Sequence, residues 1–173
     1  MILNEDLDWN QVATDPALQR AFRGTPVKTL LPEGRMLCRF ITTETSKRIS
    51  VSIIRRTPGT NTFLSPWWTD WNTTASELTR WKAAKATARD VIRARLAVTI
   101  AFSRELDSLV QIILTQRVYA WKGLAQYQDD TVAKVTYLGG AEQYFLPNLA
   151  CDKEGLSSKV AYMHSFTGIE SLV

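Results

Sequence analysis

Three short stretches of the sequence place polar side chains in apolar, strand-like surroundings. Arg39 lies inside MLCRFI, Ser65 ends TFLS immediately before Pro66, and Glu142 and Gln143 open EQYFLP. A guanidinium group in such a strand has to reach solvent, pair with a carboxylate or hold an anion, because burying it unpaired costs several kcal/mol. Ser65 is unremarkable by itself, and the proline after it fixes the backbone as the chain leaves the apolar run.

The EQYFLP stretch follows Gly139 and Gly140 and is stopped by Pro147. Its polar pair is either offered to a ligand at a strand end or belongs to an ordinary last strand of a sheet. Side chains alternate across a strand, so Glu142 and Gln143 face opposite ways unless a bulge intervenes, and the two glycines are compatible with a bulge. Only one of the two side chains is therefore expected to address a cleft.

Trp67, Trp68 and Trp71 crowd into one short stretch. Three indoles in a loop after a strand cannot all enter one core, so at least one is expected to line a cleft or contact a partner. A flat aromatic wall suits a nicotinamide, an adenine or another base. The alternative is that Trp67 and Trp71 pack under the helix that follows.

Four more residues are weaker candidates. Tyr119 and Trp121, in VYAWKG, are further candidates for a cleft wall, and Arg93 or Arg95 could contact a phosphate. Ordinary strand packing and a solvated basic segment are the alternatives for these residues.

Several kinds of chemistry are disfavoured by residue content. His164 is the single histidine, so a histidine-rich metal site is impossible and a Ser-His-Asp arrangement would have to use this residue. Cys38 and Cys151 have no CxxC spacing, so neither a disulfide framework nor a zinc site is expected, and each is interpreted as a buried small apolar side chain. Neither a Rossmann nor a P-loop glycine pattern is present.

Composition indicates one compact globular domain over 1–173. The 173 residues are 45% hydrophobic, and the formal net charge of +4 fits an anionic ligand, a nucleotide or a nucleic acid without requiring one. No run of 18 apolar residues occurs, and the first ten residues are acidic and polar, so we expect no membrane span and no signal peptide. The expectation is a soluble protein, either cytoplasmic or delivered to a target cell by a signal-peptide-independent route.

The order of expected elements predicts an α+β fold with a mostly antiparallel, split or two-sheet β core. A helical N-terminal segment, 1–33, is expected to pack on a β-rich core, 34–173, with Asp15 capping a helix that begins at Pro16. One long helix is expected over 73–94, with Thr73 or Thr74 as N-cap and with Trp81 against the sheet. The expected strands are 34–42, 47–56, 95–102, 109–121 and 142–147, with KVTYL leading into the last and a short strand in the tail.

Arg39 on an early strand, Ser65 before a helix and the polar pair before Pro147 together resemble the ADP-ribosyltransferase family in its arginine-serine-glutamate branch. The resemblance spans roughly 34–149. FLSPWW has proline and tryptophan where the family has Thr-Ser after the serine. The family's glutamate stands four residues before the proline, a place that Gln143 occupies here, with Glu142 one residue early.

The resemblance implies an enzyme that binds NAD as its substrate. Arg39 would bridge the phosphates, Ser65 would fix the active-site strand, and Gln143 or Glu142 would contact the nicotinamide ribose. The nicotinamide would stack on an aromatic of the SPWW stretch, so Trp67, Trp68 and Tyr119 join Arg39 and Ser65 as candidate NAD-binding residues. A neutral amide can hold the ribose, but it stabilises a developing oxocarbenium ion poorly.

By the same resemblance the protein would be a bacterial toxin or effector that modifies a macromolecule, protein or nucleic acid, or cleaves NAD. Two alternatives come from other classes. One is a non-enzymatic protein-interaction module that uses a tryptophan-rich surface, and the other is a nucleic-acid-binding protein that uses the arginines of 80–104.

Overall fold

The computed structural model describes residues 2–42, 66–100, 105–149 and 161–167, the last range as a strand without its side chains. The described chain has an α+β fold with a largely antiparallel sheet, which confirms the predicted class. Its helices are α1 (Trp9–Val12), α2 (Pro16–Gln19), α4 (Trp71–Ala83) and α5 (Ala88–Leu96). Its strands are β1 (Val27–Leu31), β2 (Met36–Ile41), β3 (Trp67–Asp70), β4 (Ser108–Leu114), β5 (Val118–Leu124), β6 (Gln128–Asp130), β7 (Val135–Tyr137), β8 (Glu142–Phe145) and β9 (Ala161–Thr167).

Seven strands form one sheet in the order β1-β5-β8-β3-β2-β4-β9, and β6 and β7 form a separate two-stranded hairpin. Sequence neighbours are mostly not sheet neighbours: β5, for example, lies between β1 and β8. The predicted strands at 34–42 and 142–147 are β2 and β8. The predicted strand at 109–121 is two strands, since a turn separates β4 from β5, and the strand predicted at 47–56 lies outside the described residues.

The N-terminal helices are short and begin where their capping residues predict. Asp15 accepts a hydrogen bond from the amide of Ala17 at 2.7 Å, with Pro16 in the first helical position, and Asp8 caps α1 in a capping box with Gln11. The segment 1–33 is not wholly helical, however, because β1 lies within it and pairs with β5.

The single helix predicted over 73–94 is two helices. The first, α4, begins at Trp71 rather than after Thr73 or Thr74, because the Asp70 carboxylate accepts the amide of Thr73 at 3.3 Å and acts as N-cap. It ends by Lys85, whose φ of 62° is left-handed, and the second helix starts after its own cap, Thr87. No proline or glycine marks this break, so the Ala- and Lys-rich pattern hid it.

The helix α5 also runs through the start of the strand predicted at 95–102. It ends at Leu96. Ala97 then adopts a left-handed φ of 52°, and its amide donates a hydrogen bond to the carbonyl of Arg93. The described part of 95–102 is therefore helix end and turn, and the strand prediction is wrong there. Trp81 was expected against the sheet but is 38% exposed, whereas Leu78 on the same helix is buried.

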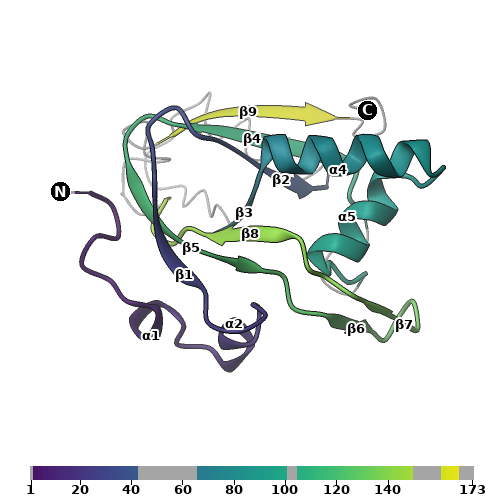
Figure 1. Cartoon of the computed structure of the whole chain (residues 1–173), viewed down its shortest axis with the longest axis horizontal. Coiled ribbons are helices and arrows are strands. Elements are labelled where there is room, and N and C mark those ends of the chain that lie inside the picture. The colour runs from purple at the N-terminus through teal and green to yellow at the C-terminus, as the bar shows by residue number, and fades with distance from the viewer. Residues whose placement is uncertain (1, 43–65, 101–104, 150–160, 168–173) are drawn as a thin grey trace.

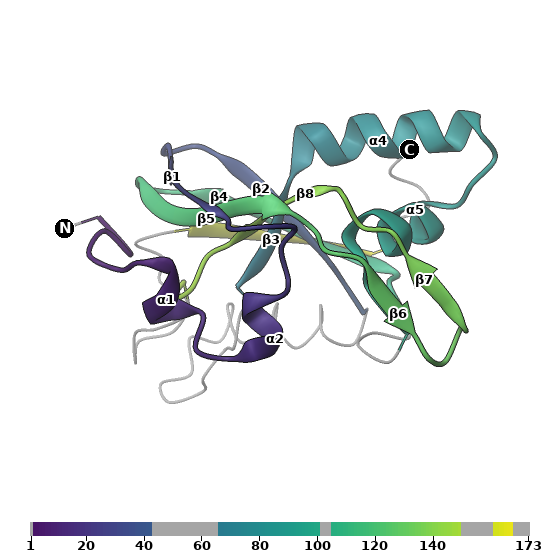
Figure 2. The same ribbon diagram turned by 60° about the horizontal axis from the view of Figure 1, so that its bottom comes forward.

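The strand register separates the side chains of the large sheet into two faces. Leu37, Trp68 and Tyr144 share one face, which buries a core of aliphatic side chains with them. On the other face α4 and α5 cover the β2–β4 end, and α1 and α2 cover the β5–β8 end. Figures 1 and 2 show these two helix pairs at separate ends of the sheet, so none of the described helices lies over the strands between them.

The glycine pair before β8 makes a tight connection rather than a bulge. Gly139 and Gly140 have φ of 68° and 83°, and β8 then pairs continuously with β5 through Glu142–Leu124 and Gln143–Gly123. The Gly139 amide donates to the carbonyl of Ala94 at 2.8 Å, which ties the connection to α5. A side chain at Gly139 would meet the carbonyl oxygen of Ala125 at 2.5 Å.

We therefore predict that Gly139→Ala lowers the free energy of unfolding by about 2–3 kcal/mol, because backbone contact adds to the left-handed φ. Gly34→Ala is the matched control: its φ is 77°, but no atom lies within 4 Å of the added carbon, so its cost is about 1 kcal/mol. Chemical denaturation of both variants measures the difference. Equal losses would show that close approach to Ala125 is unimportant.

Candidate functional site

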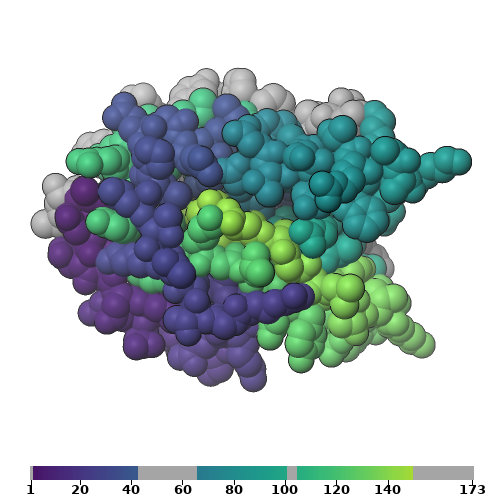
Figure 3. All heavy atoms as spheres, in the orientation of Figure 1, coloured from purple at the N-terminus to yellow at the C-terminus, as the bar shows by residue number. Residues whose placement is uncertain are grey.

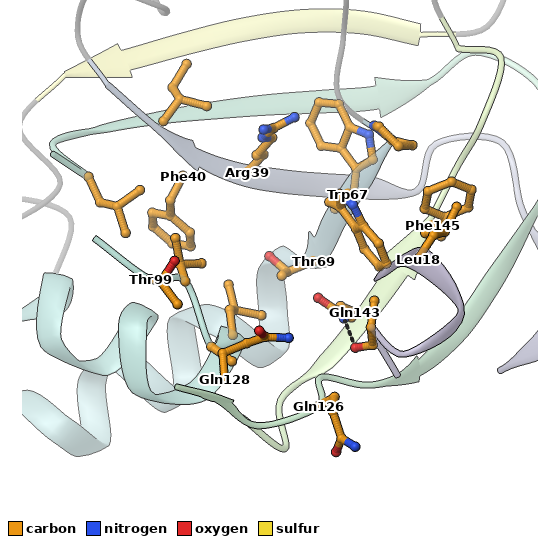
Figure 4. A pocket seen from close by; sticks show the side chains of 18 of the residues that line it. Leu18, Arg39, Phe40, Trp67, Thr69, Thr99, Gln126, Gln128, Gln143 and Phe145 are labelled. Carbon is orange, nitrogen blue, oxygen red and sulfur yellow. Dashed lines mark hydrogen bonds between the residues drawn. The ribbon is translucent and has the colours of Figure 1, made fainter. Parts of the chain in front are cut away.

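A pocket of about 910 Å³ opens on the strand face between the two helix pairs (Figure 4). Its floor is formed by β2, β3 and β8, one wall by α2 and the segment after it, and the opposite wall by the end of α5 and the β5–β6 connection. In Figure 3 the ends of α4 and of the β6–β7 hairpin form two projections on one side of the molecule. The volume lies in the range of small-molecule sites.

Gln143 is the member of the polar pair that faces this pocket. It is buried to 9% exposure on β8, opposite Gly123 of β5, and its Nε2 donates to the carbonyl of Ala21 at 3.2 Å. A carbonyl can only accept, so this bond fixes the amide with its nitrogen towards Ala21. The side chain is thereby positioned to offer its oxygen to a ligand as a hydrogen-bond acceptor.

Glu142 points to the opposite face of the sheet, as alternation requires. Its Oε2 lies 2.8 Å from Nζ of Lys122, and its Oε1 accepts the Tyr144 hydroxyl at 3.0 Å. The bond to this carboxylate raises the pKa of Lys122, and burial, followed by the Glu142 hydrogen bond, raises the pKa of Tyr144. Glu142 is thus part of a surface ion-pair network and does not line the pocket with Gln143.

The two adjacent tryptophans lie in β3, not in a loop as predicted, and alternation separates them. The Trp67 ring packs edge-on against Phe145 at 4.9 Å between centroids and lies 5.4 Å from Phe22, on the pocket face. Trp68 borders the pocket, but its indole is 1% exposed in the core of the other face. Trp71 is the first residue of α4 and packs on the core under the helices, the alternative left open for it.

Arg39 borders the same pocket through β2, yet its side chain is turned to the other face. Cys38 pairs with Thr69 on the pocket face, so Arg39, the next residue, points the opposite way. Figure 4 shows the Arg39 side chain on the side of β2 opposite Phe40 and Gln143. The pocket therefore brings together Gln143 and Trp67, but the Arg39 guanidinium group lies on the opposite face of the sheet from the Gln143 amide.

The guanidinium of Arg39 is poorly solvated. Burial lowers its pKa from 12.5 to about 10. Among the described residues no carboxylate forms an ion pair with it, in contrast to Arg35, which pairs with Asp70 at the start of α4. A desolvated cation favours a nearby anion, one of the three outcomes that the sequence left open for Arg39.

Three other candidate residues lie either outside the described residues or away from the pocket. Ser65 lies outside the described residues, although its neighbour Pro66 lines the pocket. Tyr119 does not line the pocket, and Nζ of Lys28 lies 4.8 Å from its ring centroid. Trp121 was also expected at a cleft wall, but it is 1% exposed in the core.

The two arginines expected to contact phosphate are otherwise engaged. Arg95 lies 3.2 Å from a carboxylate oxygen of Glu77. Arg93 is buried, and its Nη1 donates to the carbonyl of Val98 at 3.1 Å. Neither residue extends into the pocket as a free cation.

The cysteine and histidine chemistry that the sequence disfavoured finds no support in the described chain. Cys38 is fully buried, and burial raises the pKa of its thiol to about 12. Cys151 and the His164 side chain lie outside the described residues. Within the described ranges no three His, Cys, Asp or Glu side chains lie together in a way that could hold a metal ion. No described helix is both long and apolar enough to cross a bilayer.

Sequence reasoning missed Thr69, Thr99 and Gln128, which also line the pocket. Thr69 belongs to a strand that the sequence interpretation treated as a loop. Thr99 lies in the segment predicted as a strand. Gln128 follows a stretch, AQYQDDT, that carries only a polar loop signal, so no pattern pointed to it.

The wall that contains Thr99 is held by Asp130 of β6. One carboxylate oxygen of Asp130 accepts the amide of Ile100 at 2.6 Å, and the other accepts the amides of Val132 and Ala133 at 2.9 Å each. These bonds, that from Ile100 foremost, lower the pKa of Asp130 below its ordinary value of 3.8. The carboxylate thus fixes the pocket wall to the turn of the β6–β7 hairpin.

Two solved structures resemble this fold at low sequence identity. One is the structure of Tne2 in complex with Tni2, with a TM-score of 0.52 and 13% identity, covering 86% of this chain and 98% of that chain. The other is Rhs1-CT in complex with its cognate immunity protein RhsI1, with a TM-score of 0.50 and 14% identity, covering 85% and 84%. These similarities concern the fold. No protein-family model and no curated protein matches the sequence.

Arg39→Met is predicted to raise the melting temperature by about 2–4 °C, the equivalent of about 1 kcal/mol in a chain of this size. The folded-state pKa of Arg39 is depressed, so its desolvation opposes folding at every pH below about 10, and a thioether of similar length removes that cost. Arg35→Met, which loses the pair with Asp70, should lower the melting temperature instead. A loss of stability in both variants would show that Arg39 has a compensating partner.

Asp130→Asn is predicted to destabilise the protein near neutral pH and to loosen the wall at Ile100. The stability that the ionised Asp130 carboxylate contributes is fully present above pH 3.8 and is lost as the pH falls through the lower folded-state pKa. The melting temperatures of the wild type and of Asp130→Asn should therefore converge in acid. Melting curves over pH 2–7 and hydrogen exchange at the Ile100 amide measure this. Asp129→Asn, the exposed neighbour, is the control. A difference that persists unchanged in acid would contradict the prediction.

Proposed function

We propose that the protein is an NAD-cleaving enzyme with an ADP-ribosyltransferase-like fold, acting as a bacterial toxin or effector. The observation that carries the proposal is Gln143: it occupies the place of the family's glutamate and faces a pocket of suitable volume. Trp67 of β3 pairs with Phe145 of β8, which lies two residues after Gln143, so Trp67 is on the same face of the sheet as Gln143. An acceptor oxygen and an indole on one pocket face match the needs of a nicotinamide riboside.

The chemistry follows from the leaving group. When the bond between the ribose C1′ and the nicotinamide nitrogen breaks, its electron pair neutralises the pyridinium, so nicotinamide leaves without acid catalysis. The ribose becomes an oxocarbenium-like centre, water adds to C1′, and one proton passes to solvent. Gln143 would accept a hydrogen bond from a ribose hydroxyl and hold the sugar while this charge develops.

Cleavage is favoured over transfer to a macromolecule. Asp15 is the single acidic residue among the described residues that line the pocket, and its side chain is committed to capping α2. No described carboxylate is therefore placed beside Gln143 to activate a protein or nucleic-acid nucleophile. Water, which needs less activation towards an oxocarbenium ion, is the acceptor that this arrangement suits.

The role as a toxin is supported by the fold similarity to Rhs1-CT, which was solved with its cognate immunity protein. A protein that depletes NAD would harm the cell that makes it, so a neutralising protein partner is part of the proposal. For the alternative of a nucleic-acid-binding protein, which relied on the arginines of 80–104, Arg93 is buried and Arg95 is paired with Glu77, whereas Arg80 and Arg89 are exposed.

Incubation of the protein with NAD is predicted to release nicotinamide, and Gln143→Leu should lower kcat by about 10²–10³, the usual cost of removing one transition-state hydrogen bond. Chromatography of nicotinamide and ADP-ribose measures both. Gln111→Leu is the matched control, since Gln111 is a partly buried strand glutamine that contacts Met36 and does not line the pocket. Failure of the wild type to release nicotinamide would overturn the proposal.

A further inference from the structure

The pocket has a second polar end, at β6 and the wall that contains Thr99. The proposed cleavage reaction does not use the residues of this end. Gln128 opens β6 as an exposed residue, and its side-chain amide makes no hydrogen bond to another described residue. In Figure 4 this amide extends to the pocket side of β6, with Thr99 on one side of it and Gln143 on the other. Phe40 and Val98 provide apolar surface at this end.

An unengaged primary amide above an apolar slot is suited to a particular kind of ligand. A glutamine amide can accept a hydrogen bond from the exocyclic N6 amino group of adenine and donate one to ring N7, the bidentate pairing that recognises this edge of the base. Apolar surface with few polar groups accommodates the flat ring itself. Gln126, two residues earlier, is not equivalent, because its side-chain oxygen accepts the amide of Tyr127 at 3.3 Å.

The opposite end of the pocket differs in character. Leu18, Trp67 and Phe145 line it with aromatic and aliphatic surface. An indole attracts a flat cation such as a pyridinium ring. The two ends thus suit the two different rings of a dinucleotide, with Gln143 between them (Figure 4).

We infer that the Gln128 end of the pocket is an adenine subsite, in which Gln128 reads the amino edge of the base. The inference rests on the proposed function for the identity of the dinucleotide. It adds that the pocket discriminates purines: hypoxanthine presents two acceptors, O6 and N7, at this edge, and the one acceptor and one donor of the Gln128 amide cannot match both in either orientation. It also orients the substrate, adenine towards β6 and nicotinamide towards Trp67.

The experiment compares NAD with nicotinamide hypoxanthine dinucleotide, which differs at the amino position alone. The wild type should prefer NAD by about 10-fold or more in kcat/KM for nicotinamide release, the value of one good bidentate contact. Gln128→Leu should lower kcat/KM for NAD and bring this ratio near 1. Gln126→Leu, the matched control, should keep the wild-type ratio.

A second arm separates the two proposals. Calorimetric titration with AMP and with IMP measures the same discrimination without requiring cleavage: the wild type should bind AMP more tightly, and Gln128→Leu should bind both alike. If nicotinamide is released but the wild type shows no preference, or Gln128→Leu keeps it, the adenine subsite is wrong and NAD cleavage stands. If no nicotinamide is released, cleavage is wrong, and preference for AMP over IMP still decides the subsite.

Discussion

The alternation of side chains across four strands, joined in three pairs, decides what the pocket contains. The pairs Cys38–Thr69, Trp67–Phe145 and Gly123–Gln143 fix the register of β2, β3, β8 and β5, so a one-residue shift would exchange every side chain on the floor. The observed register places an amide and an indole at the pocket. It places Glu142, Trp68 and Arg39 on the other face.

The described helices turn this strand face into a site by packing at its two ends and not over its middle. The α1–α2 pair buries Trp121 and Phe145, and the α4–α5 pair buries Cys38 and Phe40, so each has its own small core. The separation of the two helix pairs depends more on local backbone conformations and hydrogen bonds than on the pattern of apolar residues. The left-handed residues after α4 and α5 redirect the chain, and the Asp130 carboxylate fastens the segment after α5 to the hairpin.

These backbone conformations and hydrogen bonds explain which elements could be predicted from the sequence and which could not. Apolar strands with clear punctuation, such as β2 and β8, and the capped helix at Asp15 were predicted, because local chemistry determines them. The break in 73–94 was missed because Lys85 adopts a left-handed conformation without glycine, and 95–102 was misinterpreted because its alternation coincides with a helix end. For the site, alternation showed that Glu142 and Gln143 diverge, but the choice between them required the pairing with Gly123.

The position of Gln143 also explains why an amide, not a carboxylate, is suited to this chain. Its nitrogen donates to the Ala21 carbonyl while the residue is nine-tenths buried, and a glutamate there would set an unpaired anion against that oxygen. A carboxylate would stabilise an oxocarbenium ion better, but the segment after α2 would lose its side-chain hydrogen bond to β8 and keep only its backbone bonds to Leu124 and Gln126. In the proposed reaction the pyridinium is itself a good leaving group, so a well-placed neutral acceptor would be sufficient for cleavage and is compatible with the packing that forms the pocket.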